Sequence, residues 1–205
     1  MTEIENAPIF PLRTILFPES RLPLRIFEPR YLDMVSQCMR EDSEFGIILS
    51  RETNQPKMFE TYNVGTMAKI IDWNQGDDGL LGLTTIGTQK FKLLTMTKQD
   101  DGLNIGQIER IDKEGEFKPT ENFAYLINLL QAILDDINLY TDDQKKFDSA
   151  SWVSFRFAEI LPLKLEDKQK CLEIDDRGNK NEKKFKKVLC SSNDGIYHST
   201  RSKII

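Results

Sequence analysis

Apolar positions are densest between Ile9 and Tyr31, where prolines interrupt them. The prolines of this stretch are Pro11, Pro18, Pro23 and Pro29. Because proline lacks a backbone donor and has a fixed φ, it is excluded from helix interiors and from central strand positions. The opening stretch, defined here as residues 9–31, is therefore expected to form short extended pieces with bends at Pro11, Pro18 and Pro23.

A helix is expected to begin at Pro29, because the first helical residue needs no partner for its N–H. Glu28 then becomes the N-cap, and Phe27 can pack on Leu32 as a hydrophobic staple. Apolar residues follow at spacings that place them on one helical face. These residues are Tyr31, Leu32, Val35, Cys38 and Met39.

Short apolar runs farther along the chain predict strands. The runs cover residues 45–49, 64–73, 80–86, 89–97 and 103–111. The segments NQGDDG (74–79) and QDDG (99–102) carry turn chemistry, so each joins two strands into a hairpin. Gly87 is expected to break the run that surrounds it, and residues 51–60 to form a loop. Hairpins of this kind predict a compact antiparallel β-barrel or sandwich.

The character of the sequence changes at the charged linker DKEGEFKPT (112–120), which we interpret as a domain boundary. Beyond it, apolar residues recur at helical spacing in three segments. The expected helices cover residues 120–138, capped by Thr120, residues 148–161, capped by Asp148 and stopped by Pro162, and residues 165–174. The chain is thus predicted to contain a barrel subdomain over residues 8–112 and a small helical bundle over residues 119–176.

Composition narrows the functional classes. The chain of 205 residues is 39% hydrophobic and 30% charged, as in ordinary globular proteins, and its net charge is −5. This acidic balance argues against nucleic acid as the main partner. No apolar run is long enough for a membrane span, and the start of the sequence does not have the pattern of a secretory signal. The three cysteines are scattered, which fits a reducing compartment. We therefore expect a cytoplasmic protein. Residues 177–205, with eight Lys or Arg against two acids, are expected to form a loose basic tail.

The sequence offers no catalytic constellation. It has no GxxxxGK[ST] loop for ATP phosphates and no serine in a recognisable nucleophile setting. The only histidine, His198, lies in the basic tail, and a single histidine does not make a zinc site. Paired aspartates such as Asp77 and Asp78 lie in or beside expected turns, where they favour turn formation. We therefore expect no catalytic residues, no metal and no cofactor.

The order of several segments resembles the Lon N-terminal domain family. The segments are FPLRTILFPESRLPLRIFEPRYLDMV, FGIIL, VGTMAKI, GLLGLTTIGTQKFKL and WVSFRFAEILPLKLEDKQKCLEIDD. The resemblance covers about residues 8–176 and implies an α+β fold, a PUA-like antiparallel β-barrel followed by a small helical bundle. It also implies a module that recognises polypeptides for degradation, as in stand-alone Lon-domain proteins that lack the ATPase and protease parts. The sequence differs from the family in two places. Arg25 occupies a position where the family often has histidine. After Asp176 the sequence no longer resembles the family, and one hypothesis for this difference is an altered reading frame.

The candidate binding residues lie in the opening stretch. They are Phe17, Leu22, Arg25, Arg30 and Tyr31. Two interpretations are open. In the first, the apolar members are core residues, and Arg30 holds the helix in place by pairing with a carboxylate. In the second, some of the five residues form an exposed patch that binds unfolded segments, with arginine at its rim.

Three functional hypotheses follow. The first is a non-enzymatic adaptor that binds unfolded or partly folded polypeptides, with a separate protease as a second partner. The second is an RNA-binding protein that uses the PUA-like barrel and the basic tail. The third is a peptidase, which the missing nucleotide and serine–lysine motifs argue against.

Overall fold

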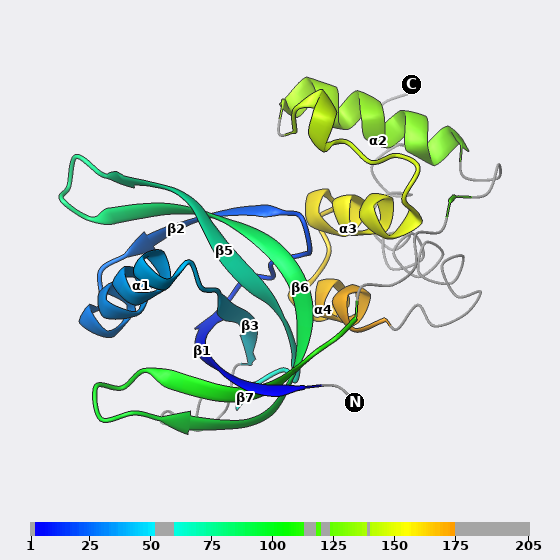
Figure 1. Cartoon of the computed structure of the whole chain (residues 1–205). Coiled ribbons are helices and arrows are strands. Elements are labelled where there is room, and N and C mark those ends of the chain that lie inside the picture. Colours follow the sequence, from blue (N-terminus) through cyan, green and yellow to red (C-terminus); the bar gives the residue numbers. More distant parts are fainter. Residues whose placement is uncertain (1–2, 52–59, 113–117, 120–123, 139, 175–205) are drawn as a thin grey trace. The chain divides into compact units, whose positions relative to one another are not determined.

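The described residues between Ile4 and Arg110 form seven strands and one helix (Figure 1). The structure is a computed structural model that describes residues 3–51, 60–112, 118–119, 124–138 and 140–174. The chain divides into two compact units, residues 1–113 and 114–205. The elements of the first unit are β1 (Ile4–Leu12), β2 (Arg21–Ile26), α1 (Pro29–Glu41), β3 (Phe45–Arg51), β4 (Glu60–Thr61), β5 (Val64–Gln75), β6 (Leu81–Lys98) and β7 (Asn104–Arg110).

The strands form one sheet whose order is β1-β7-β6-β5-β3-β4, with β2 added beside β6. Among the strand pairs of the described residues, only β1 and β3 run parallel, with Ile9 opposite Gly46. This pairing connects the first strand of the order back to β3, so β1, β7, β6, β5 and β3 form a closed ring of pairings. The predicted α+β class and its largely antiparallel strands are confirmed.

The expected bends at Pro11 and Pro23 are wrong, because both prolines lie inside strands. β1 pairs with β7 only up to Ile9, and Pro11 lies beyond that point, opposite Ile48 of β3 alone. Pro23 belongs to β2, which pairs only with β6 among the described strands. Each proline thus has a free side on which its missing N–H is not needed. Pro18 does lie in a turn, as predicted.

The predicted break at Gly87 is also wrong, because β6 continues through it from Leu81 to Lys98. The glycine is required for a different reason. A Cβ atom at residue 87 would lie 2.3 Å from the carbonyl oxygen of Phe17. The main chains also hydrogen-bond here, since Glu19 N donates to Gly87 O and Gly87 N donates to Ser20 O. Gly87 therefore permits close packing of the turn that precedes β2 against β6.

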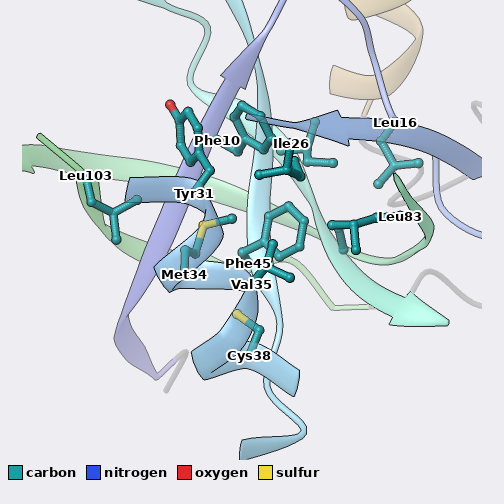
Figure 2. Packing of buried hydrophobic residues seen from close by; sticks show 12 residues of the cluster. Phe10, Leu16, Ile26, Tyr31, Met34, Val35, Cys38, Phe45, Leu83 and Leu103 are labelled. Atoms are coloured by element: carbon teal, nitrogen blue, oxygen red, sulfur yellow. The ribbon is translucent and has the colours of Figure 1, made fainter. Parts of the chain in front are cut away.

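Helix α1 begins at Pro29 with Glu28 in an extended N-cap conformation, as predicted. The expected staple buries little surface, because Phe27 is 65% exposed and Leu32 is 37% exposed. The inner face of α1 packs into the main core (Figure 2). This core consists of Phe10, Leu16, Ile26, Tyr31, Met34, Val35, Cys38, Phe45, Ile47, Ala68, Leu83 and Leu103.

The second unit is helical in its described part. Its elements are α2 (Ala124–Ile137), the short 3-10 helix η2 (Asp142–Gln144), α3 (Ala150–Ile160) and α4 (Leu165–Glu173). Helix α3 contacts both α2 and α4. Its N-cap is Ser149 and not the predicted Asp148, because the Ser149 hydroxyl accepts a hydrogen bond from Trp152 N at 3.3 Å. The helix ends before Pro162, as predicted.

Some expectations fall on residues outside the described ranges. They concern the Thr120 cap, most of the 51–60 loop, the basic tail of residues 177–205 and His198. Within the described ranges, no helix combines the length and the apolar character needed to cross a membrane. The same ranges hold no group of three or more His, Cys, Asp or Glu residues placed to bind a metal ion.

Candidate functional site

The apolar candidates of the opening stretch lie inward. Phe17 is 1% exposed and Tyr31 is 5% exposed. Tyr31 stacks on Phe10 with 4.0 Å between ring centroids. Leu22 is half-buried and packs against the main core. These three side chains therefore support the first unit from inside, where burial of large apolar groups contributes most to stability.

The two arginine candidates bind loops of the same unit. The exposed guanidinium of Arg25 forms an ion pair with Asp78 in the β5–β6 turn. Arg30 forms an ion pair with Glu28, donates to Gly102 O at 3.0 Å, and lies 4.9 Å above the Tyr31 ring centroid. Arg30 thus connects the start of α1 to the β6–β7 turn. Arg30 and Tyr31 are brought together, whereas Arg25 contacts a different turn.

Exposed apolar side chains gather at the other end of α1. Met39 is 43% exposed, Ile71 is 44% exposed and Trp73 is 57% exposed. All three line a groove of about 310 Å³ between the end of α1 and strand β5, which we name the α1–β5 groove. The residues that line it are Cys38, Met39, Asp42, Ser43, Lys69, Ile70, Ile71, Asp72 and Trp73.

The groove exists because β3 begins late. β3 pairs with β5 only from Phe45, which lies opposite Ala68. The residues of β5 after Ala68 therefore have β6 as their only strand neighbour among the described residues. In the chain before Phe45, helix α1 ends, Asp42 adopts a left-handed conformation with φ of 49°, and Ser43 N donates to Cys38 O at 3.0 Å. Figure 1 shows α1 between the β5–β6 and β6–β7 hairpins.

Charges surround the groove. Lys69 Nζ lies 3.0 Å from an Asp42 carboxylate oxygen, so this ion pair joins β5 to the end of α1. A second cavity of about 460 Å³ shares Cys38, Asp42, Ser43 and Lys69 with the groove. Carboxylates outnumber cations along both cavities: Glu5, Glu41, Asp42, Glu44 and Asp72 against Lys69 and Arg110.

The thiol in this region does not suit nucleophilic chemistry. Cys38 is 3% exposed, and burial raises the pKa of its thiol above the usual value. A thiol held neutral is a poor nucleophile, because the thiolate is the reactive form. The lining of the groove provides apolar side chains, backbone groups and charged side chains.

One feature of the sequence indicates this site, although the periodicity of apolar residues alone does not reveal it. Ile70, Ile71 and Trp73 put three large apolar residues into the second half of one strand. Ile70 lies opposite Thr85 and Trp73 opposite Leu83, so both are on the core face of the sheet, with Ile71 as the extra residue of the bulge between them. Ile70 packs against the main core, whereas Trp73 lies farther along the strand, where the core does not cover it. An apolar strand end beside the polar turn NQGDDG is therefore the clue to exposed apolar surface.

Comparison with known sequences places this architecture in a family. The sequence model of the ATP-dependent protease La (LON) substrate-binding domain matches residues 6–185, which extends past Asp176. Lon protease of Buchnera aphidicola subsp. Schizaphis graminum is 28% identical over 179 residues, or 82% of this chain. Lon protease of Xanthomonas oryzae pv. oryzae is 23% identical over 194 residues, or 88% of this chain. The chain spans only 22% of the length of each of these two relatives.

Solved structures share the fold. A Lon N-terminal domain protein from Xanthomonas campestris has a TM-score of 0.75 and 29% identity, covering 91% of this chain and 98% of that one. The N-terminal domain of Lon protease from the Mycobacterium avium complex has a TM-score of 0.63 and covers 94% of this chain and 100% of that one. At 14% identity, the second likeness concerns the fold alone.

Proposed function

Because the chain belongs to the LON substrate-binding domain family, we propose that it recognises polypeptides and that the α1–β5 groove is its binding surface. The observation that carries the proposal is the exposed apolar group of Met39, Ile71 and Trp73 on one groove. Exposed apolar surface gathered in one place marks interaction sites in soluble proteins. Methionine and tryptophan suit varied partners, because one adapts its shape and the other combines an apolar ring with a hydrogen-bond donor.

The proposed mechanism is reversible capture. An exposed segment of an unfolded client would bury apolar side chains against Trp73 and Met39, and release would follow when the client folds or is handed on. The candidate catalytic features are absent from the sequence, and the Cys38 thiol is held neutral, so we propose that binding involves no covalent step and no ATP. In this role the protein is an adaptor or recognition module for a separate protease.

Binding of a permanently unfolded protein tests the proposal. Reduced and carboxamidomethylated α-lactalbumin, whose blocked cysteines carry no added charge, is titrated by calorimetry into the intact protein, with folded α-lactalbumin as the reference ligand. The variant Trp73→Ala removes the most exposed ring of the groove, and Phe27→Ala is the matched control, because Phe27 is 65% exposed and does not line the groove. Both substitutions are at exposed positions and are expected to change stability by less than about 1 kcal/mol.

The expected result is binding of the unfolded form only, weakened about tenfold by Trp73→Ala, which corresponds to losing one well-packed aromatic contact. Phe27→Ala is expected to bind like the intact protein. Equal binding by the intact protein and Trp73→Ala would refute the groove as the binding surface.

A further inference from the structure

The α1–β5 groove runs along the edge of a strand, not over one face of it. Its lining includes five consecutive residues, Lys69–Trp73. Alternation is interrupted here by the register shift between Ile70 and Asp72, so Ile70 and Trp73 lie on one face of the sheet and Asp72 on the other. The lining includes residues of both faces, such as Trp73 and Asp72, so the groove follows the backbone edge.

This edge has no partner strand among the described residues. The pairing of β5 with β3 stops at Ala68, whereas its pairing with β6 continues to Gln75 opposite Leu81. A strand with one neighbour presents a row of backbone donors and acceptors on its other side. The backbone N–H of Trp73 donates to Oδ1 of the neighbouring Asp72 at 2.8 Å. A carbonyl oxygen of an added strand would replace this carboxylate oxygen as the acceptor.

The charges along the edge favour a cationic partner. Lys69 already has Asp42 as its ion-pair partner at 3.0 Å. Asp72 forms no ion pair within the described ranges. In the adjoining cavity Arg110 already pairs with Glu5 and Glu44, so Glu41 is the further carboxylate there that has no cationic partner among the described residues. A segment with lysine or arginine beside apolar residues would therefore complement both the carboxylates and the exposed rings.

We propose that the β5 edge from Lys69 to Gln75 binds an extended polypeptide segment of alternating apolar and basic residues by strand addition. This inference rests on the proposed function and defines its substrate class. The apolar side chains of the segment contact Trp73, Ile71 and Met39, its basic side chains face Asp72, and its backbone pairs with β5. A register shift between Ile70 and Asp72 bends this part of β5, which limits the paired length to a short segment.

Four synthetic peptides test the inference against the intact protein. The first has about nine residues, a usual strand length, in which Leu alternates with Lys. The second carries Glu in place of Lys. The third and fourth carry backbone N-methyl groups on the odd or on the even residues, which removes the donors on one side of the strand or the other. Affinity is measured by anisotropy, with Asp72→Asn tested beside the control Asp77→Asn, a turn residue outside both cavities.

Strand addition predicts that N-methylation of one alternate set weakens binding about tenfold or more, while the other set changes it by less than about twofold. The Leu–Lys peptide is expected to bind about tenfold more tightly than the Leu–Glu peptide. Asp72→Asn is expected to weaken the Leu–Lys peptide about threefold, and Asp77→Asn to leave it unchanged.

The outcomes separate this inference from the proposed function. If unfolded α-lactalbumin requires Trp73 but neither N-methyl pattern matters, the groove binds side chains only and strand addition is refuted. If the Leu–Glu peptide binds as tightly as the Leu–Lys peptide, the basic substrate class is refuted. If a second copy of the chain occupies the edge, sedimentation will show dimers that the peptide does not dissociate, and the inference is overturned. Equal binding by Trp73→Ala refutes the groove itself, and with it both proposals.

Discussion

The ring of Tyr31 stacks on the ring of Phe10 with 4.0 Å between centroids and 26° between planes. This contact joins the first turn of α1 to β1 inside the main core. Arg30 covers the same ring from outside, and burial raises the pKa of the Tyr31 hydroxyl. The stacked pair attaches the first turn of α1 to the sheet, and the other end of the same helix forms one wall of the α1–β5 groove.

Replacement of Tyr31 by alanine is therefore expected to lower the free energy of unfolding by about 3 kcal/mol, the usual effect of removing a buried aromatic ring. Tyr31→Phe keeps the stack and is expected to cost less than about 1 kcal/mol. Urea unfolding followed by circular dichroism measures both. Similar losses for the two variants would mean that the hydroxyl, and not the stack, supports α1.

A side chain at Gly87 is expected to be costly. The Cβ atom of Gly87→Ala would lie 2.3 Å from Phe17 O, a backbone atom that cannot rotate away, so we expect a loss of about 2 kcal/mol. Gly79→Asn is the control, because Gly79 has a positive φ of 78° but no atom near its Cβ position, and asparagine tolerates that conformation. Thermal unfolding compares the two, and equal melting temperatures would contradict the close approach.

In the second unit, Lys145 bridges two carboxylates, with Nζ 2.8 Å from Asp142 Oδ1 and 2.5 Å from Asp135 Oδ1. The hydrogen bond from Lys145 lowers the pKa of Asp142 below its usual 3.8. A lowered pKa stabilises the folded state above the unfolded pKa, and this contribution is lost as the pH falls through the folded pKa.

Lys145→Gln should consequently raise the Asp142 pKa back toward its usual value and make the second unit less sensitive to acid. An NMR titration of the Asp142 carboxyl carbon measures the pKa directly. An unchanged pKa in Lys145→Gln would show that another group is responsible.

The ion pair between Lys69 and Asp42 offers a test of the charge argument. Lys69→Gln releases the Asp42 carboxylate and should strengthen binding of the Leu–Lys peptide about threefold at low ionic strength. Lys98→Gln makes the same charge change at an exposed position outside the groove and should have no effect. An identical response of both variants would mean that net charge, and not the groove, controls binding.

Local signals in the sequence predicted much of the first unit. The start of α1 follows from Pro29, and the β5–β6 and β6–β7 hairpins follow from turn residues, because these choices act over a few neighbouring residues. The predicted bends at Pro11 and Pro23 and the predicted break at Gly87 are wrong. Whether a strand tolerates proline or glycine depends on which strands and turns lie beside it, and these neighbours are set by the tertiary structure. Periodicity gives no information on these neighbours.

The candidate site was less accessible to sequence reasoning. Phe17 and Tyr31 are conspicuous in the sequence, yet both serve the core. Met39 and Trp73 have the pattern of ordinary members of a helix face and a strand. The late start of β3 relative to β5 leaves the strand end at Trp73 with one strand neighbour among the described residues, beside the end of α1 that carries Met39. Only the register of strand pairing brings them to one groove.

Mapping of amide chemical shifts locates the residues of the α1–β5 groove that contact a bound polypeptide. The ¹⁵N-labelled protein is titrated with the Leu–Lys peptide. The largest shifts are expected at residues 38–43 and 69–75, with slowed amide hydrogen exchange in the second range. Shifts centred on Arg25 and Arg30, or confined to residues 124–174, would contradict binding in this groove.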